Sequence, residues 1–591
     1  MYHSDGTQTS FPDTAAGLQS AVSTSRAADI VECAPQSSGV VYDFTGAQFF
    51  LAVASGVTLR SSDYQSLPGG RVCAADTAQC ASDAPHMCKI VNNNLASYHL
   101  AALQDGTQGF TLDGVEIAAS SKCLYCALLA TSNSTSRSQD TTQNITFTRL
   151  WLHGYFGLPG PEKCLAVWGG VNVTIRNSLL SECGKANGQD GQGIGILSGS
   201  GIHISNNAIE AETQNVMIGG GQSTVVGEPP QSITISYNWL FKDLWWKQTY
   251  QPYDPSGQCL YWAGNSHGEL WQNTLTGGQF QCTSRGNWGT FTSPTGAALD
   301  PAVYTDNKNL IEVKPATDPG GPTGGSVSIY GNIGENTYCA QQGSPIITNA
   351  SPPPVAPVQG TYIGYNLWRN HGQFYSAGNY PQYATGTTVE HNICDSCAEP
   401  LRCPGPGTAT IKYIAQGGVY RHNSFPNASN ALQLVYYNES ATPGVNATVM
   451  DNIGNYGYRF LNGSGGHTCA WVFGAGGPDA GGILAYNIVP LNAASIQTAL
   501  GDLNQYNSGA PDCYNNQFPA WSSGVYVNEK GGDYHVQAQY KGTASDGTDP
   551  GANVDAVMRM TSGVRSGVLV RRRSVRVVTD NSARSGPARF P

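Results

Sequence analysis

The sequence predicts one long right-handed parallel β-helix, an all-β solenoid with a short capping helix at its N-terminal end. Three observations predict it: a composition suited to short strands, a strand-and-turn unit that recurs along the chain, and an amphipathic segment before the first strand. Gly accounts for 72 of 591 residues and charged residues for 12%, against about 25% charged in ordinary domains. Asn, Ser, Thr, Val, Ile and Tyr are abundant, which favours short strands joined by tight turns.

The recurring unit consists of alternating β-branched residues, a polar residue, an Asn and an apolar residue, as in VNVTIRNSLL and SITISYNWLF. Successive units lie 26–36 residues apart, except for one gap of 59 residues that is interpreted as two rungs with one unit unrecognised. The Asn residues identified at the turn are Asn177, Asn207, Asn238, Asn273, Asn332, Asn366, Asn392, Asn423, Asn452 and Asn487, and Asp113 and Arg149 take the same place upstream.

This periodicity favours stacking because a single rung cannot bury its apolar face. Variable spacing is typical of a solenoid whose loops differ while its strands stay in register. Asn tolerates the left-handed backbone of a turn, and at the strand spacing of about 4.8 Å its side chains can hydrogen-bond along the stack. A β-propeller, which needs four strands per ~40–45 residues with its own signatures, and a string of sandwiches are the alternatives. No Trp-Asp propeller signature is present.

The ends of the chain differ from its body. Residues 1–40 are predicted as an N-terminal segment and cap, with a short helix and a following strand within 13–32, and residues 41–557 as the β-helix. Solenoids need such caps to cover an open rung. Residues 558–591 hold eight basic residues and one acidic residue, giving +7 against −17 for the rest, and are predicted to be a disordered tail. The acidic body argues against nucleic acid as a partner.

The 16 cysteines favour local disulfides over zinc, because the pairs Cys123–Cys126 and Cys394–Cys397 lie far apart and have no neighbouring His at ligand spacing. Disulfides indicate an oxidising compartment, so an extracellular or cell-surface location is expected, although no signal peptide is visible at Met1. Eight Asn-x-Ser/Thr sequons, including Asn144, Asn172 and Asn438, would allow a glycoprotein but are no more than chance predicts. No apolar run approaches the ~20 residues of a membrane span.

Several segments resemble secreted bacterial β-helix proteins of the pectin-lyase-like superfamily. They are LQSAVSTSRAADIVE, FTRLWLHG, NNAIEAETQNVMIGGG, ITISYNWLFKDLWW, KNLIEVK and GTASDGTDPGANVDAV, and they are spread over most of residues 13–557. The resemblance implies the fold and, as a substrate class, carbohydrate. The Arg-rich signature of pectate lyases and the Asp-Asp pair of polygalacturonase-like hydrolases are not found here, so neither mechanism is carried over.

A column of carboxylates is the candidate metal site. Counting five residues past the turn Asn on three consecutive rungs gives Glu182, Glu212 and Asp243. If these rungs stack without an insertion, the carboxylates lie about 5 Å apart and repel one another unless a cation bridges them. Calcium prefers such oxygen ligands, so Ca²⁺ is the expected cofactor. The alternative is three solvated turn residues that point apart.

Candidate catalytic residues come from the same half of the chain. Lys247 follows a Trp pair, Lys308 precedes Glu312 in KNLIEVK, and Asp190 lies in a Gly-rich loop that suits close approach of a ligand. Glu312 alternates with two apolar residues and is therefore expected on a face opposite the core. Glu210 is a further candidate. Together with Glu212, Glu312 and Asp190 it forms the set of carboxylates from which a hydrolase would need two. For each lysine the alternative is an ordinary surface charge, and for Asp190 a plain turn.

Tryptophan is concentrated between residues 151 and 288, with eight of the eleven in the chain. Exposed indoles stack on the apolar faces of sugar rings, so Trp245, Trp246, Trp262 and Trp271 are candidate substrate-binding residues, together with His153. These tryptophans equally suit irregular loop packing, and a lone His is more often structural. The neighbouring loops, residues 249–300 and 313–360, are long enough to be functional.

Three hypotheses of function follow, with a polysaccharide as the expected partner of the first two. The first is a secreted carbohydrate-active protein that acts on an acidic polysaccharide as a calcium-assisted lyase. The second is a glycoside hydrolase, which requires two carboxylates ~5–9.5 Å apart. The third is a non-catalytic carbohydrate-binding protein, adhesin or structural surface protein. The sequence does not give the oligomeric state or the sugar.

Overall fold

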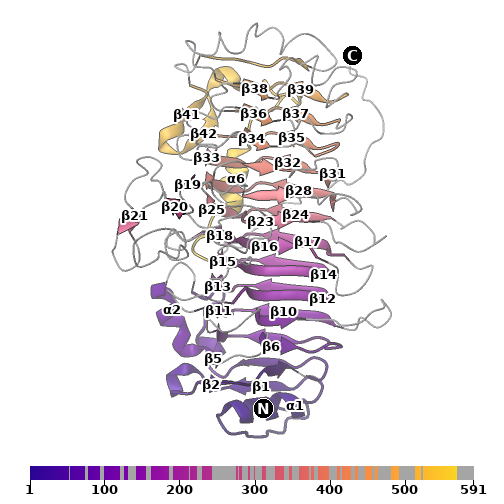
Figure 1. Cartoon of the computed structure of the whole chain (residues 1–591), viewed down its shortest axis with the longest axis vertical. Coiled ribbons are helices and arrows are strands. Elements are labelled where there is room, and N and C mark those ends of the chain that lie inside the picture. The colour runs from indigo at the N-terminus through magenta and orange to yellow at the C-terminus, as the bar shows by residue number, and fades with distance from the viewer. Residues whose placement is uncertain are drawn as a thin grey trace.

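Parallel strands stack in three long columns that run along the molecule (Figure 1). In the computed structural model the described residues are 1–51, 53–73, 77–92, 99–119, 126–130, 142–154, 161–184, 191–211, 213–221, 229–242, 274–276, 279–281, 291–292, 298–299, 309–314, 326–337, 345–348, 358–371, 374–377, 384–397, 409–412, 415–427, 433–436, 446–454, 459–462, 481–490, 513–520 and 524–568. The fold is the predicted right-handed parallel β-helix.

Each complete rung contributes one strand to each of three faces. The first face comprises β3 (Phe49–Leu51), β6 (His99–Leu103), β9 (Cys126–Ala130), the first parts of β12 (Lys163–Arg176) and β14 (Gln192–Ser205), β16 (Gln214–Ile218), β23 (Ile311–Val313), β26 (Ile346–Thr348), β30 (Tyr375–Ser376), β34 (Ala409–Lys412), β36 (Gln433–Tyr436) and β38 (Arg459–Asn462). The second face comprises β1 (Ile30–Cys33), β4 (Thr58–Ser61), β7 (Thr111–Asp113), β10 (Gln143–Thr148), the second parts of β12 and β14, β17 (Gln231–Ser236), β24 (Val327–Tyr330), β28 (Thr361–Gly364), β32 (Thr388–Glu390), β35 (Val419–Arg421), β37 (Thr448–Met450), β39 (Ile483–Ala485) and β40 (Cys513–Tyr514). The third face comprises β2 (Tyr42–Asp43), β5 (Cys88–Asn92), β8 (Val115–Ala119), β11 (Trp151–His153), β13 (Leu179–Cys183), β15 (Ala208–Ala211), β18 (Trp239–Phe241), β25 (Ile333–Thr337), β29 (Leu367–His371) and β33 (Ile393–Cys397).

Alternating inward residues of the three faces form the core. On the second face Ile175 pairs with Ile204, and Ile204 with Ile235, and all three are buried. Stacking therefore removes from water the apolar face that a single rung would expose. Trp368 is also fully buried, and Gly334 on the neighbouring strand makes room for it, because a Cβ there would meet the indole at 2.2 Å.

An asparagine ladder follows the corner between the second and third faces. In each rung the Asn Oδ1 accepts from the backbone N–H and the Nδ2 of the Asn one rung earlier, as between Asn366 and Asn392 (3.2 and 2.9 Å). The ladder comprises Asn207, Asn238, Asn332, Asn366, Asn392, Asn423, Asn452, Asn487 and Asn516. The predicted stack of amides is confirmed, with Asn516 as an additional member.

In the rung before Asn207, the predicted ladder position is one residue too early. Ser178, not Asn177, holds the ladder position, because the Ser178 N–H donates to Asn207 Oδ1 at 3.0 Å. Asn177 takes the preceding left-handed position with φ 56°, as Arg149 does with φ 51°. Asn suits either position, so the motif alone could not separate them.

The rung predicted at Asn273 is wrong. Asn273 itself lies outside the described residues, but Asn238 bonds directly to Asn332 at 3.1 Å and β17 pairs directly with β24. No rung is therefore inserted between them. Residues 243–308 lie in the sequence between β18 and β23, and their described strands form two antiparallel pairs, β19 (Thr274–Thr276) with β20 (Gln279–Gln281) and β21 (Phe291–Thr292) with β22 (Ala298–Leu299).

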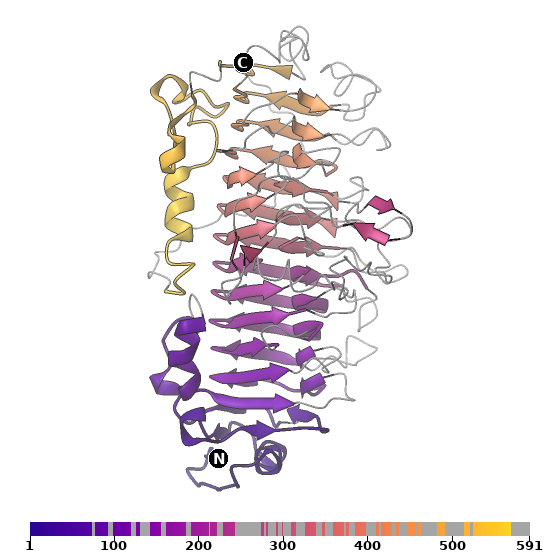
Figure 2. The ribbon, with the colours of Figure 1, turned by 60° about the vertical axis from the view of Figure 1, so that its left-hand side comes forward.

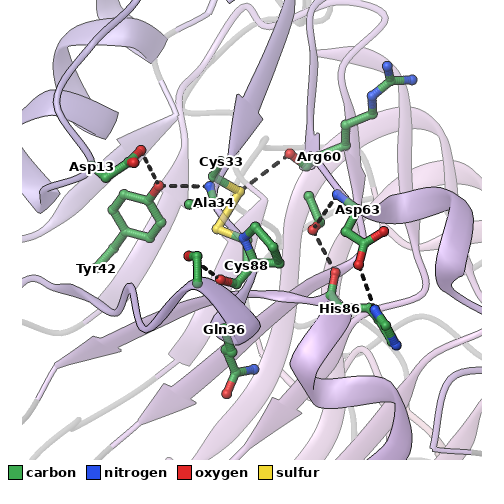
Figure 3. The surroundings of a disulfide bond; sticks show 12 residues. Asp13, Cys33, Ala34, Gln36, Tyr42, Arg60, Asp63, His86 and Cys88 are labelled. Carbon is green, nitrogen blue, oxygen red and sulfur yellow. Dashed lines mark hydrogen bonds and ion pairs between the residues drawn. A yellow bond between two sulfur atoms is a disulfide. The ribbon is translucent and has the colours of Figure 1, made fainter.

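The predicted N-terminal cap is helix α1 (Ala15–Thr24), which leads into β1. Thr14 caps the helix by accepting from the Gly17 N–H at 3.1 Å, and Leu18 and Val22 are buried against the first rung. Figure 3 shows the Cys33–Cys88 disulfide behind this cap.

Described disulfides otherwise link nearby residues, as predicted: Cys73–Cys80, Cys164–Cys183 and Cys394–Cys397. The last of these closes one of the two Cys-x-x-Cys motifs. Helices within the described ranges are all too short or too polar to cross a membrane.

A C-terminal segment, residues 524–568, leaves the last rungs and folds back along the corner of the solenoid (Figure 2). It contains β41 (Tyr526–Asn528), β42 (Asp533–Val536) and helix α6 (Val554–Thr561). Val557 and Val564 are buried. The predicted start of a disordered tail at residue 558 is therefore wrong: it falls inside α6, and the described part of this segment extends to residue 568.

Candidate functional site

A cluster of charged and amide side chains lies on the outer surface of the first face. Lys163 pairs with Gln192 and Gln192 with Gln214, while Met217, on the same strand as Gln214, pairs with Glu312. The cluster thus extends over four consecutive rungs, β12, β14, β16 and β23. All four polar side chains are less than 9% exposed, which is unusual for such residues.

Glu312 is at the centre of one half of this cluster. Its Oε2 accepts from Gln214 Nε2 at 2.8 Å, and its Oε1 lies 3.1 Å from Lys314 Nζ. The flanking residues Ile311 and Val313 belong to the core, so the predicted placement of Glu312 opposite the apolar face is confirmed. Two-residue spacing puts Glu312 and Lys314 on the same outer surface.

Lys163 forms the other half with Glu162. Their charged atoms are 2.5 Å apart, and both residues are less than 9% exposed. Gly195 on the next rung makes space for the lysine stem, because a Cβ there would lie 3.1 Å from Lys163 Cδ and 2.6 Å from Gln192 Oε1. The glycine is thus required by the close approach of a functional side chain.

Gly220 has the same relationship to Lys314. It has φ +80°, and a Cβ there would lie 3.0 Å from Lys314 Cδ and 2.5 Å from Met217 Cε. Both lysines therefore cross a glycine on a neighbouring rung, which fixes the path of their aliphatic stems.

An aromatic pair borders the cluster on the N-terminal side. Trp168 and His99 make an edge-to-face contact with ring centroids 5.5 Å apart. Burial lowers the pKa of His99 to about 4, so His99 is neutral at neutral pH. This pair offers an apolar surface next to the charged groups.

Other predicted catalytic residues flank this cluster in sequence. Lys308 directly precedes Asn309, and Asp190 directly precedes Gly191, but Lys308, Asp190 and Lys247 lie outside the described residues. So do the four predicted substrate-binding tryptophans, Trp245, Trp246, Trp262 and Trp271.

Glu210 lies on a different surface. It belongs to β15 of the third face, is 3% exposed, and its Oε2 accepts from the Glu182 N–H at 3.0 Å. Nearby Lys242 is also buried and donates to the carbonyls of Ala211 and Thr213 (2.8 and 2.5 Å). These contacts stabilise the corner between the third and first faces.

Glu182 occupies a bulge in β13. It has φ 55°, and the register shifts so that Cys183, rather than Glu182, pairs with Ala211. Counting five residues past the turn Asn therefore does not give equivalent positions on the neighbouring rungs at Glu182. Glu212 and Asp243 lie outside the described residues, and within the described ranges no group of three His, Cys, Asp or Glu side chains could hold a metal ion.

His153 belongs to a buried network on the third face. Its Nε2 lies 3.1 Å from Glu116 Oε1, and its ring stacks on Trp151 at 4.1 Å. Glu116 also bonds with Gln36 (2.5 Å) and Lys89 (2.6 Å). Burial alone would raise the pKa of Glu116, but the hydrogen bond and charge of His153 and the charge of Lys89 lower it. This network joins the cap region to the third face.

Sequence reasoning missed Lys163, Glu162, Gln192 and Gln214. Their signal is a polar residue at the start of a largely apolar first-face strand, in EKCLAV, GQGIGI and TQNVMI. That signal becomes interpretable only after the first-face strands are aligned.

Comparisons with known proteins find several solved structures that are similar at low sequence identity. A PL6 family polysaccharide lyase from Pseudopedobacter saltans is 11% identical, with 91% of this chain and 98% of that chain covered and a TM-score of 0.33. The tailspike protein of E. coli bacteriophage HK620, solved with a hexasaccharide, is 10% identical (89% and 78% covered, TM-score 0.42), and an endo-xylogalacturonan hydrolase from Aspergillus tubingensis is 8% identical (85% and 96% covered, TM-score 0.32). No protein-family model and no curated protein matches the chain.

The stacked parallel strands of the chain itself confirm the β-helix fold that the resemblance implied.

Proposed function

We propose that this chain is a secreted carbohydrate-active protein that binds a linear acidic polysaccharide along its first face and cleaves it by β-elimination. The observation that carries the proposal is the row of Lys163, Gln192, Gln214, Glu312 and Lys314 over four rungs. Amide and carboxylate groups suit sugar hydroxyls, and ammonium groups suit uronate carboxylates. A row that advances about 4.8 Å per rung suits a polymer better than a single small molecule.

The disulfides support secretion, because they persist in oxidising compartments. The acidic body gives no long-range attraction for a polyanion. Binding would therefore depend on the two lysines, each held in place by a neighbouring carboxylate, and on contacts at close range.

Elimination requires neutralisation of the uronate carboxylate and a base that removes the adjacent proton. Lys163 and Lys314 are assigned to the first task, because their ammonium groups lie in the row, beside Glu162 and Glu312, and an ammonium group is a compact point charge that can contact a uronate carboxylate. Lys247 or Lys308, two of the predicted catalytic residues, is proposed as the base that removes the proton. A Ca²⁺ ion at Glu182, Glu212 and Asp243 remains a second proposed source of positive charge.

Hydrolysis by the first-face carboxylates is less well supported. Glu162 and Glu312 are three rungs apart, which corresponds to about 14 Å along the solenoid. Glycosidases need carboxyl groups about 5–9.5 Å apart. A hydrolase would therefore need a second carboxylate from elsewhere in the chain.

The test is incubation of the full chain with polyuronates and with neutral polysaccharides, in calcium and in EDTA. Ultraviolet absorbance reports the unsaturated product of elimination, and reducing ends without absorbance report hydrolysis. We expect absorbance from a polyuronate only. The double variant Lys163→Met/Glu162→Gln, which avoids an unpaired buried charge, should lose it, whereas Lys541→Ala, an exposed control, should not.

Binding without either product would support a carbohydrate-binding protein and contradict the lyase. Equal activity of the double variant and the wild type would contradict the site itself.

A further inference from the structure

A stack of rings lies under the C-terminal segment at the corner between the second and third faces. Tyr365, His391 and His422 take the left-handed position of three consecutive rungs. Their rings are nearly parallel, with centroids 4.9 Å apart in both contacts. The stack is regular because the positions repeat with the rungs.

Residues 545–553, which precede helix α6, cover this stack. The Asn553 N–H donates to His391 Nδ1 at 3.3 Å. The Asp546 carboxylate lies 3.2 Å from His422 Nε2. The contact at His391 therefore requires a neutral imidazole whose Nδ1 keeps its lone pair.

The same nine residues are held at three further points on the rungs. Ser545 N–H donates to Asp451 Oδ1 at 2.7 Å, and Gly551 N–H donates to the Asp451 carbonyl at 2.7 Å. Ala552 N–H donates to Ser424 Oγ at 2.8 Å. Beyond residue 553, α6 has its own apolar contacts through buried Val554 and Val557.

We propose that residues 545–553 form an acid-sensitive clasp, which opens when His391 is protonated while the solenoid and α6 stay folded. Protonation would remove the acceptor of the Asn553 N–H. It would also place a positive charge against the stacked ring of His422, which has a buried Nδ1 without a hydrogen-bond partner among the described residues.

The charges around His391 come from three elements. Glu390 on β32 and Asp546 of the clasp favour the protonated ring, whereas His422 and Arg421 disfavour it. Burial is the largest effect, and with His422 it lowers the pKa of His391 to about 4. Arg559 on α6 acts on the adjacent Tyr365.

The direction of the pH effect follows from linkage. The ordinary pKa of His is about 6.5, so the opened state binds a proton at higher pH than the closed state. The stability given by neutral His391 is complete above pH 6.5 and is lost as the pH falls toward 4. Burial raises the pKa of Asp451, so its contribution has the opposite sign and opposes opening.

Hydrogen exchange of the full chain tests the clasp, with each rate corrected for the intrinsic pH dependence. Between pH 7 and pH 4.5 we expect exchange of the amides of 545–553 to rise about tenfold or more, with no change in β35. In His391→Tyr the rise should disappear, because Tyr stacks at equivalent positions such as Tyr365 without titrating in this range. Asp451 remains in both proteins, so the comparison isolates His391.

His86→Gln is the matched control, because His86 is a partly exposed histidine of the N-terminal region that pairs with Asp63. It should keep the rise seen in the wild type. A flat profile in the wild type, an equal rise in His391→Tyr, or simultaneous loss of protection in β35 would each overturn the proposal.

Discussion

Asn238 Nδ2 donates to Asn332 Oδ1 at 3.1 Å, although the two residues are 94 positions apart in the chain. Two rungs that are distant in sequence are thus nearest neighbours in the ladder. Residues 243–308 are thus inserted in the sequence between β18 and β23 of one rung, and Lys308 precedes β23 with only Asn309 and Leu310 between them.

Replacing residues 243–308 by a short Gly/Ser linker should leave the solenoid folded. The corresponding connection one rung earlier, from Ala211 to Gln214, needs only two intervening residues. We expect unchanged far-ultraviolet circular dichroism and a thermal midpoint within a few degrees of the wild type. Activity on a polyuronate should be lost if Lys247 or Lys308 is the base. Aggregation of the shortened chain would show that the insertion covers apolar surface of the rungs.

Breaking the ladder should destabilise the protein. In Asn332→Leu the buried N–H of Asn238 and the Ile235 carbonyl lose their partners, at a cost of about 3 kcal/mol or more in the free energy of unfolding. Denaturant unfolding measures the change. The control is Lys541→Ala, since Lys541 is exposed and should change stability by less than about 0.5 kcal/mol. Equal effects of both substitutions would contradict a structural role for the ladder.

Gly195→Ala should weaken polysaccharide binding without unfolding the protein. The added methyl group would displace the Lys163 stem and the Gln192 amide, so we expect a loss of affinity of about tenfold or more by calorimetry. Gly69→Ala is the control, because a Cβ there meets nothing within 4 Å. Unaltered binding by Gly195→Ala would place the polysaccharide elsewhere on the molecule.

Acid should weaken the third-face network through Glu116. Its pKa is lowered in the folded state, so its contribution to stability is present above the ordinary carboxyl pKa of about 4.3 and is lost as the pH falls through the folded value. In Glu116→Gln the stability should fall less steeply below pH 5 than in the wild type. Thermal midpoints from pH 7 to pH 3 measure the slope, and identical slopes would contradict this role.

Calcium remains a testable ligand of the predicted carboxylates. If Glu182, Glu212 and Asp243 bind Ca²⁺, EDTA should lower the thermal midpoint, because removal of a ligand that binds only the folded state destabilises it. Glu212→Gln should remove most of the response. An unchanged midpoint in EDTA would exclude a tightly bound stabilising ion at this position.

Local sequence patterns were enough to predict the class of fold, most of the ladder and the N-terminal cap. These are repeated, local features: alternating inward residues, Asn after a left-handed position, and Thr14 before a helix. It also placed Glu312 opposite the core, since strand alternation depends only on neighbours.

Local patterns could not predict which distant segments are adjacent. The bulge at Glu182, the neighbouring position of Asn238 and Asn332, and the row from Lys163 to Glu312 depend on register between rungs. One added residue in a turn changes that register without altering the local pattern. The C-terminal segment was misjudged for a related reason: its basic composition suggested disorder, but Arg565 pairs with Glu335 at 2.7 Å, a contact 230 residues away in sequence that composition does not encode.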